Sequence, residues 1–245
     1  MSDHMNRPNT TNSSAKMHVA GVDGCRGGWL CVDERDGELT GHIFSTFKEL
    51  LDALPAASIV AVDIPIGLSD AGERPVDPIA RKLLRAPRSS SVFPVPIGAV
   101  VQETDYRTAC QKHWAVDGRA LSKQAFAILP KIREVDSLLG AGPGLQARVR
   151  EIHPEVCFAV WNKGRAMKHR KSESLGRAER ERLIDAAWPG QRERILGELR
   201  GDFELDDVND AFAALWTARR IFSGTAKVLG PQTVDRHGLR MEMWA

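Results

Sequence analysis

The chain has 245 residues, of which 42% are hydrophobic and 27% are charged, and its formal net charge is +2. This composition is typical of a globular protein and excludes a strongly basic chain, so any attraction to phosphate must come from local patches. No apolar run approaches the roughly 20 residues that span a bilayer. The four cysteines contain no CxxC pair, which argues against a zinc site and a disulfide scaffold. We therefore expect a cytoplasmic protein without membrane contact.

The first elements read as a polar leader followed by a β-meander. Residues 1–16 lack the apolar stretch of a signal peptide and are predicted to be a disordered leader before a single domain over residues 17–245. Strands are predicted at residues 18–23, 29–34 and 39–46. A Gly-rich turn separates the first two, and an Asp-Gly tight turn precedes the third.

A helix, a buried strand and an insertion come next. Apolar residues at 47, 50, 51 and 54 have helical spacing. Residues 58–65 contain an apolar run without alternation, which is typical of a strand covered on both faces. Residues 66–117 are rich in proline and arginine and predict an ordered insertion, with a short helix capped by Asp77.

The second half of the chain is mainly helical. Helical or loop-and-helix segments are predicted at residues 121–139, 162–182, 191–201 and 206–222. Pro130 should kink or break the first, and Asp206 is a plausible N-cap of the last. A strand is expected within residues 147–161, with His153 and Glu155 near its end. A meander plus strand–helix units gives a mixed α/β sheet flanked by helices.

Two carboxylates end apolar strands. Asp23 closes the first strand and Asp63 closes the fourth. If these strands are parallel neighbours, both acids lie at the carboxyl edge of the sheet, where open α/β sheets bind ligands. Aspartate is also a common turn residue, so either acid alone is more often structural.

Further acids lie on the last predicted helix and near the predicted fifth strand. Asp207 and Asp210 share a helix face, where like charges repel. The helix dipole offsets this repulsion for an acidic first turn, which explains Asp207 better than Asp210. Glu155 and His153 are additional candidates, although a lone histidine is more often a structural hydrogen-bonding group than a ligand.

Together these acids predict a metal centre. A buried cluster of carboxylates needs arginines, protons or hard cations, and oxygen ligands suit Mg²⁺ or Mn²⁺. Two such ions would support hydrolysis of a phosphodiester bond. The predicted catalytic residues are Asp23, Asp63, Glu155, Asp207 and Asp210, and the predicted metal ligands are Asp23, Asp63, Asp207 and Asp210.

The order of elements resembles the ribonuclease H-like superfamily, which implies metal-binding acids on the first strand, the fourth strand and the last helix. Asp23 and Asp63 match the first two positions. Residues 206–218 resemble the last helix of bacterial Holliday-junction resolvases, whose pattern of Asp, two residues, Asp and Ala is present here. One departure is that the fourth-strand acid is an aspartate rather than a glutamate, with Pro65 shortly after it.

More closely, the chain resembles an uncharacterised family described as predicted nucleases of ribonuclease H fold (domain-of-unknown-function family 429). The shared stretches include GVDGCRGGW, VDIPIGL, RPVDPIARKLL, SSSVFPVP, QAFAILPKIREVD, EIHPEV, DDVNDAFAALWTA and GLRMEMW. The resemblance implies a ribonuclease H-like five-stranded mixed sheet flanked by helices, with a long insertion after the fourth strand. It also implies a divalent-metal-dependent nuclease.

Basic residues supply candidate phosphate contacts. Arginines recur at helical spacing within residues 81–88, and a second basic cluster spans residues 163–171. Such patches supply non-specific affinity for nucleic acid, although charge runs often only stay solvated. The serine-rich stretch RSSSVFPVP could bind a phosphate or cover the sheet edge. The candidate substrate-binding residues are Arg26, Arg81, Arg88, Ser90, Lys131 and His153.

Two other functions stay open. The Asp and Gly-rich stretch GVDGCRGGW also fits the phosphate loop of the sugar kinase and actin-like superfamily, whose members are nucleotide-dependent phosphotransferases, but no second such hairpin follows. A nucleic-acid-binding module without catalysis is the third alternative. The sequence leaves the type of nucleic acid and the oligomeric state open, a homo-oligomer included.

Overall fold

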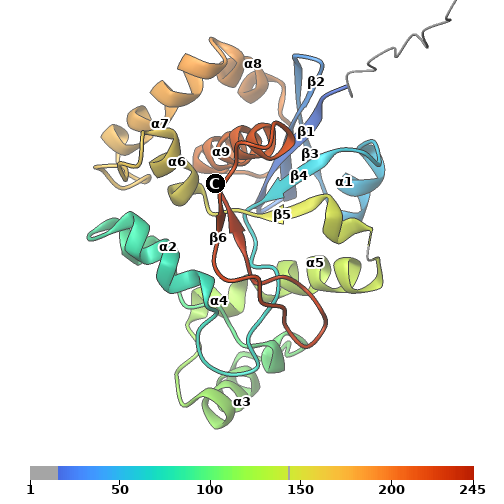
Figure 1. Ribbon diagram of the computed structural model, residues 1–245, viewed down its shortest axis with the longest axis vertical. Helices are drawn as coiled ribbons and strands as arrows, with labels where there is room; N and C mark the ends of the chain where they lie inside the picture. The colour runs from blue at the N-terminus through green and yellow to red at the C-terminus, as the bar shows by residue number, and fades with distance from the viewer. Residues whose placement is uncertain (1–15, 143) are drawn as a thin grey trace, which may run out of the picture.

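The computed structural model describes residues 16–142 and 144–245. Its centre is a five-stranded mixed sheet with strand order β3-β2-β1-β4-β5 (Figure 1). The strands are β1 (His18–Cys25), β2 (Gly28–Arg35), β3 (Glu38–Phe44), β4 (Ile59–Val62) and β5 (Val149–Glu151). The first three pair antiparallel, and β4 and β5 continue the sheet parallel to β1. The predicted meander plus parallel strands is confirmed, whereas the predicted leader falls, except for Lys16, outside the described residues.

Two-residue turns join the strands of the meander. Asp36 and Gly37 connect β2 to β3 with φ values of 50° and 94°, so the turn predicted from the Asp-Gly pair is confirmed. Gly28 follows the turn between β1 and β2 and has a φ of 127°. A Cβ atom there would lie 2.1 Å from the carbonyl oxygen of Phe44, so this position requires glycine.

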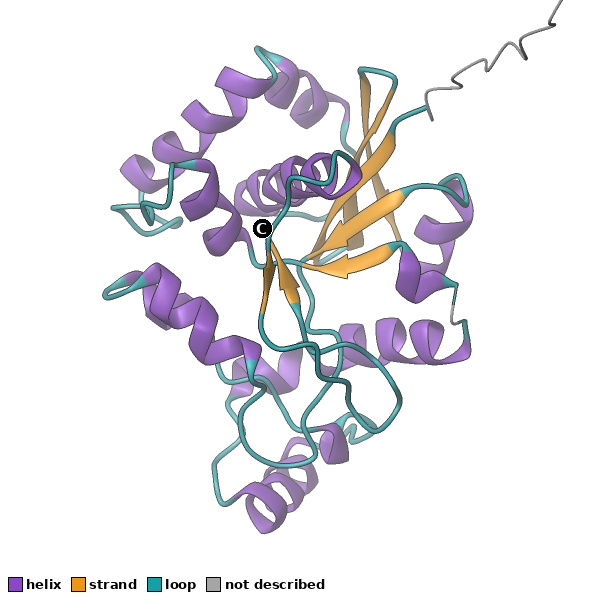
Figure 2. Ribbon diagram, viewed as in Figure 1, coloured by secondary structure: helices purple, strands orange, loops and turns teal. Residues whose placement is uncertain are grey.

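Helices cover both faces of the sheet (Figure 2). One face carries α6 (Pro154–Trp161), α7 (Ser174–Ala187), α8 (Gln191–Glu198) and α9 (Leu205–Phe222), and the other carries α1 (Phe47–Ala53) and α5 (Leu129–Ala141). Val60, Ala61 and Val62 of β4 are buried between them, as predicted for a strand covered on both faces. In the described part of the chain, none of the helices is both long enough and apolar enough to cross a membrane.

The helix α9 lies directly against the backbone of β1. A Cβ atom on Gly21 would lie 2.0 Å from the backbone nitrogen of Leu215 and 2.1 Å from the carbonyl oxygen of Ala211. Only a residue without a side chain allows this approach. The contact places the first turns of α9 beside the end of β1 that carries Asp23.

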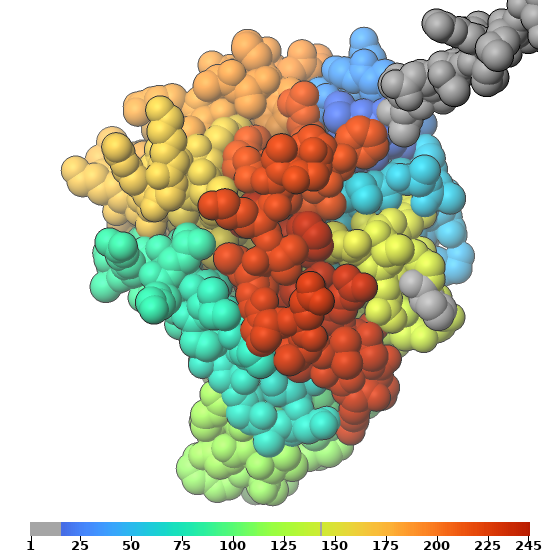
Figure 3. Space-filling view, in the orientation of Figure 1, coloured from blue at the N-terminus to red at the C-terminus, as the bar shows by residue number. Residues whose placement is uncertain are grey.

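The insertion between β4 and α5 is ordered, as predicted. It contains α2 (Val76–Leu84), α3 (Tyr106–Asp117) and α4 (Lys123–Ala127), which lie below the carboxyl edge of the sheet in Figure 1. The C-terminal segment, red in Figure 3, runs from α9 over the insertion and contributes β6 (Val228–Leu229) and β7 (Met243–Trp244). Asp235 of this segment accepts a hydrogen bond of 3.1 Å from the backbone nitrogen of Leu68 in the insertion.

The structure corrects several predicted boundaries. The helix expected over residues 121–139 is broken into α4 and α5, and Pro130 lies in the first turn of α5, where its missing N–H is tolerated. The N-cap of α9 is Glu204 rather than Asp206. Asp77 lies inside the first turn of α2 and binds Arg74 instead of capping the helix.

The segment after β5 also differs from the prediction. The expected strand ends at Glu151, and Pro154 begins α6. Glu155 therefore lies in the first turn of a helix, not at a strand end. Residues 154–159 are buried on all sides, so the apolar pattern of α6 carries no helical period.

Candidate active site

Two carboxylates lie at the carboxyl ends of neighbouring strands. Val22 of β1 pairs in register with Val62 of β4, and the backbone nitrogen of Asp63 donates to the carbonyl oxygen of Val22 at 3.0 Å. Asp23 and Asp63 directly follow the two paired valines. The predicted parallel pairing of the strands is confirmed, and it puts both acids at one edge of the sheet.

The third acid comes from α9. Asp210 is only 2% exposed, and its Oδ2 atom accepts a hydrogen bond of 2.6 Å from the ammonium group of Lys171. Its Oδ1 atom is buried and has no hydrogen-bond partner among the described residues. Asp23, Asp63 and Asp210 are called the three-acid cluster below.

The charges of the three-acid cluster interact. The pKa of Asp23 is raised well above its usual value, first because the group is buried and then because of the charges of Asp63 and Asp210. Burial followed by the charge of Asp210 likewise raises the pKa of Asp63. Lys171 opposes both shifts, and its own pKa is raised chiefly by Asp210. The three acids and this lysine therefore form one electrostatic unit.

The two other predicted acids have structural partners. Asp207 accepts a hydrogen bond of 2.8 Å from the backbone nitrogen of Glu204 and closes a capping box at the start of α9. Burial raises the pKa of Asp207. Glu155 is 6% exposed and binds the buried guanidinium of Arg180, with 3.0 Å from Nε to Oε1. These contacts stabilise α9 and the packing of α6 on α7.

A cleft of about 300 Å³ opens beside the three-acid cluster. Its lining combines acids, bases and hydroxyl groups: Asp63, Arg88, Ser90, Ser91, Phe93, Gln124, His153, Pro154, Glu155, Arg170, Lys171, Ser172 and Asp210. Asp23 is 7% exposed and is not among the lining residues of the described structure, although its charge interacts with those of Asp63 and Asp210. The cleft thus combines carboxylates with guanidinium and ammonium groups that suit a phosphate.

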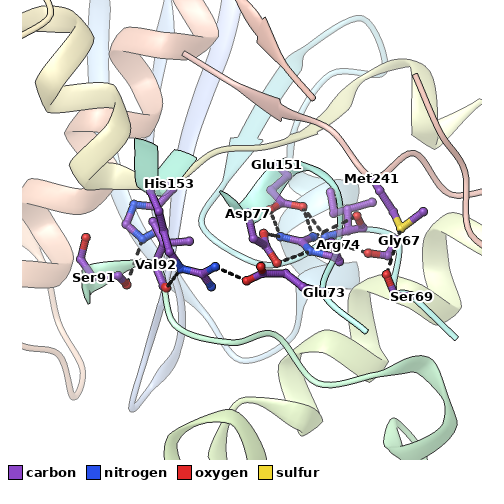
Figure 4. A network of polar contacts seen from close by, with 12 residues as sticks. Gly67, Ser69, Glu73, Arg74, Asp77, Ser91, Val92, Glu151, His153 and Met241 are labelled. Carbon is purple, nitrogen blue, oxygen red and sulfur yellow. Dashed lines mark hydrogen bonds and ion pairs between the residues drawn. The ribbon is translucent and has the colours of Figure 1, made fainter. Parts of the chain in front are cut away.

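One wall of the cleft is a single 3₁₀ turn of the insertion, Arg88–Ser91. The hydroxyl of Ser91 donates to the carbonyl oxygen of Arg88 at 2.7 Å, and that of Ser90 donates to Pro87 at 2.9 Å. The Nε2 atom of His153 lies 3.3 Å from the carbonyl oxygen of Ser91 (Figure 4). The insertion is therefore fixed to the junction between β5 and α6 at the cleft.

Three predicted substrate-binding residues lie elsewhere in the described structure. Arg26 is mostly exposed and pairs with Glu204 at 3.0 Å. Arg81 donates to the carbonyl oxygen of Val92 at 2.9 Å and pairs with Glu73. The ammonium of Lys131 lies 4.6 Å from the ring centroid of Trp29. Arg88, Ser90 and His153, by contrast, all line the cleft.

A buried ion network that the sequence did not reveal supports the insertion. Arg74 is 2% exposed, and its Nη2 atom lies 2.7 Å from Oδ1 of Asp77 and 2.7 Å from Oε1 of Glu151 (Figure 4). Glu151 ends β5 beside the end of β4, so the network ties the insertion to the edge that carries Asp63. Arg74 and Glu151 are 77 residues apart, and no local pattern indicates such a contact.

The three-acid cluster was compared with the requirements of a divalent cation. Its donors are all carboxylate oxygens, which suit Mg²⁺ or Mn²⁺, and the buried Oδ1 atom of Asp210 lacks a partner within the described ranges. In the same ranges, no group of three or more His, Cys, Asp or Glu side chains is arranged so that it could hold a metal ion as it stands. The donor set fits such an ion, and binding requires the acids to converge and Lys171 to leave Asp210.

Comparison with known proteins gives one match. Residues 21–234 match the family model described as "Protein of unknown function (DUF429)". No curated protein and no solved structure is similar enough to match the chain. The activity therefore has to be inferred from the residues of the cleft.

Proposed function

The chain belongs to the DUF429 protein family, and we propose that it is a divalent-metal-dependent nuclease that hydrolyses phosphodiester bonds. The observation that carries the proposal is the three-acid cluster, drawn from β1, β4 and α9, beside a cleft with a basic rim. The meander, the parallel strands and the last helix packed on the first strand support a ribonuclease H-like fold. In that fold, acids at these positions hold metal ions.

In this proposal the three-acid cluster holds Mg²⁺ or Mn²⁺. Bound there, such an ion would activate water and stabilise the negative charge that develops on the phosphate. Asp63 and Asp210 line the cleft and would be shared between the ion and the reacting phosphate, whereas Asp23 would hold the ion from the buried side. Asp207 and Glu155 contribute through the positions of α9 and α6.

The basic residues of the cleft orient the substrate. Arg88, Arg170 and Lys171 come from two segments and face the same cleft as the acids. Guanidinium and ammonium groups bind phosphate oxygens by charge-assisted hydrogen bonds. Phe93 adds an apolar surface against which a sugar or base can pack.

Metal-dependent cleavage by the purified protein tests the proposal. Labelled RNA, DNA, hybrid and branched substrates are incubated with Mg²⁺ or Mn²⁺ and separately with a chelator. We expect cleavage of at least one substrate with metal, and a loss of at least about 100-fold in Asp23→Asn and Asp210→Asn. Asp52→Asn, a change at an exposed residue of α1, should leave the rate unchanged. Absence of metal-dependent cleavage on every substrate, or full activity of Asp23→Asn, would refute it.

A further inference from the structure

Two buried nitrogen atoms in the cleft have no partner among the described residues. They are Nε of Arg88 and Nδ1 of His153, and both side chains line the cleft. Buried polar atoms of native proteins are almost always hydrogen-bonded to protein or to bound molecules. These atoms therefore indicate what a ligand of the cleft must offer.

The two nitrogen atoms have opposite requirements. Nε of Arg88 can only donate a hydrogen bond. The Nε2 atom of His153 faces the carbonyl oxygen of Ser91, which can only accept, so Nε2 carries the ring hydrogen. Burial lowers the pKa of His153 and keeps the ring neutral, which leaves Nδ1 as an acceptor. The ligand must supply an acceptor for Arg88 and a donor for His153.

The two groups are held in a fixed relation. Arg88 and Ser91 belong to one turn, which the hydroxyl of Ser91 closes onto the carbonyl of Arg88 at 2.7 Å. His153 binds the carbonyl of the same Ser91. An acceptor and a donor close together on the same ligand can satisfy both, and a phosphate next to a hydroxyl has this arrangement.

The size of the cleft limits the ligand. Its volume of about 300 Å³ is at the lower end of the range of small-molecule pockets. A duplex needs a far larger surface, since specific protein–DNA interfaces bury roughly 1,000–2,500 Å² of protein surface. The cleft therefore matches one nucleotide unit.

Building on the nuclease proposal, we propose that the cleft selects a nucleotide unit with a sugar hydroxyl next to its phosphate. Arg88 binds a phosphate oxygen, and His153 accepts a hydrogen bond from the hydroxyl. Nucleic acids carry such a hydroxyl in two places, at every 2′ position of RNA and at the 3′ end of a DNA strand. The interior of a DNA strand carries none and is a poor substrate.

Calorimetric binding of mononucleotides tests the recognition without relying on cleavage. The first pair of probes is adenosine 3′-monophosphate and its 2′-deoxy analogue, and the second is deoxyadenosine 5′-monophosphate and its 2′,3′-dideoxy analogue. We expect the hydroxyl to strengthen binding about tenfold in the first pair, for RNA, or in the second, for a DNA end. Equal affinity within both pairs, or no binding of any probe, overturns the proposal without the use of a variant.

Variants assign the two contacts. His153→Phe should abolish the preference for the hydroxyl, and Arg88→Met should weaken all four probes about tenfold or more. Arg107→Met, at an exposed position of α3, is the matched control and should bind as the native chain does. Retention of the preference in a folded His153→Phe protein would contradict the assignment.

Cleavage assays separate this proposal from the nuclease proposal. Closed circular DNA, linear DNA with a free 3′ hydroxyl, and DNA with one embedded ribonucleotide are compared. Cleavage of either linear substrate but not of the circle supports both proposals. Equal cleavage of all three overturns the recognition of a hydroxyl and leaves the nuclease proposal intact. Hydroxyl-dependent binding without any cleavage supports the recognition and removes the nuclease proposal.

Discussion

The ammonium group of Lys171 lies 2.6 Å from Asp210, and the side chain of this lysine is about half exposed, whereas Asp210 is buried. One positive charge cannot balance three carboxylates, so the pKa values of Asp23 and Asp63 stay raised. A divalent ion supplies twice the charge and lacks the lysine's flexible stem. Lys171 and a metal ion therefore compete for Asp210.

Replacement of Lys171 tests this competition. We expect Lys171→Met to bind Mn²⁺ at least about tenfold more tightly than the native chain, because the competing charge is removed from Asp210. Isothermal titration with Mn²⁺ measures the effect. Lys168→Met, at an exposed position of the same segment, is the control. Unchanged or weaker Mn²⁺ binding by Lys171→Met would show that the lysine does not compete.

The raised pKa of Asp63 predicts a dependence of stability on pH. Folded Asp63 keeps its proton to a higher pH than the unfolded chain, whose aspartates ionise near pH 4. Stability is therefore lost as the pH rises through the folded pKa, because the charged form is disfavoured in the folded state. Asp63→Asn avoids this loss.

We expect Asp63→Asn, without metal, to be more stable than the native chain by roughly 0.5–2 kcal/mol at neutral pH, as is common when a functional charge is removed. The difference should shrink towards pH 4. Urea unfolding between pH 4 and 8 in the presence of a chelator measures it, with Asp52→Asn as the exposed control. A variant less stable than the native chain at neutral pH would contradict the repulsion within the three-acid cluster.

Residues with a local signal could be predicted from the sequence. Asp23 and Asp63 each end an apolar strand, and Asp210 lies three residues after Asp207 on a helix. The contact between Lys171 and Asp210 spans 39 residues and depends on how two helices pack, so no periodicity reveals it. For the same reason, the 25-residue separation hid the pairing of Glu155 with Arg180.

Among the elements, the packing of α9 on β1 positions the site. The missing side chain of Gly21 lets the backbone of the helix approach the strand, with Ala211 and Leu215 on either side of the contact. Asp210 immediately precedes Ala211. The distance between α9 and β1 therefore controls the distance between Asp210 and Asp23.

A methyl group at Gly21 should separate the two elements. We expect Gly21→Ala to lower the free energy of unfolding by about 3 kcal/mol or more, because the new atom would overlap the backbone of α9. Gly140→Ala, in α5 with no atom within 4 Å of the added group, should instead stabilise the chain by about 0.5–1 kcal/mol. Chemical unfolding measures both. Similar stability of the two variants would contradict the close packing of α9.

Elements were predictable where local chemistry decides the backbone. The Asp36–Gly37 turn and the helix break near Pro130 follow from the conformations that these residues prefer. β5 was harder because only three residues pair at the sheet edge, and the buried helix α6 follows with no polar face. Burial on all sides removes the periodicity that separates a helix from a strand.

For the whole molecule, the insertion and the C-terminal segment convert a sheet edge into a cleft. The Arg74 network holds the insertion to β5, and Asp235 holds the C-terminal segment to the insertion. A buried arginine between two acids is strongly destabilising when one partner is lost, so the insertion is fixed in position. The turn that carries Arg88 thereby keeps its place near the three-acid cluster.

Divalent metal binding by the three-acid cluster is the central claim, and crystals soaked in Mn²⁺ test it most directly. We predict an anomalous difference peak in contact with carboxylate oxygens of Asp23, Asp63 and Asp210, with the ammonium of Lys171 moved away from Asp210. Crystals of Asp210→Asn should show no such peak. Native crystals without a peak at this position, in which Lys171 still binds Asp210, would contradict the claim.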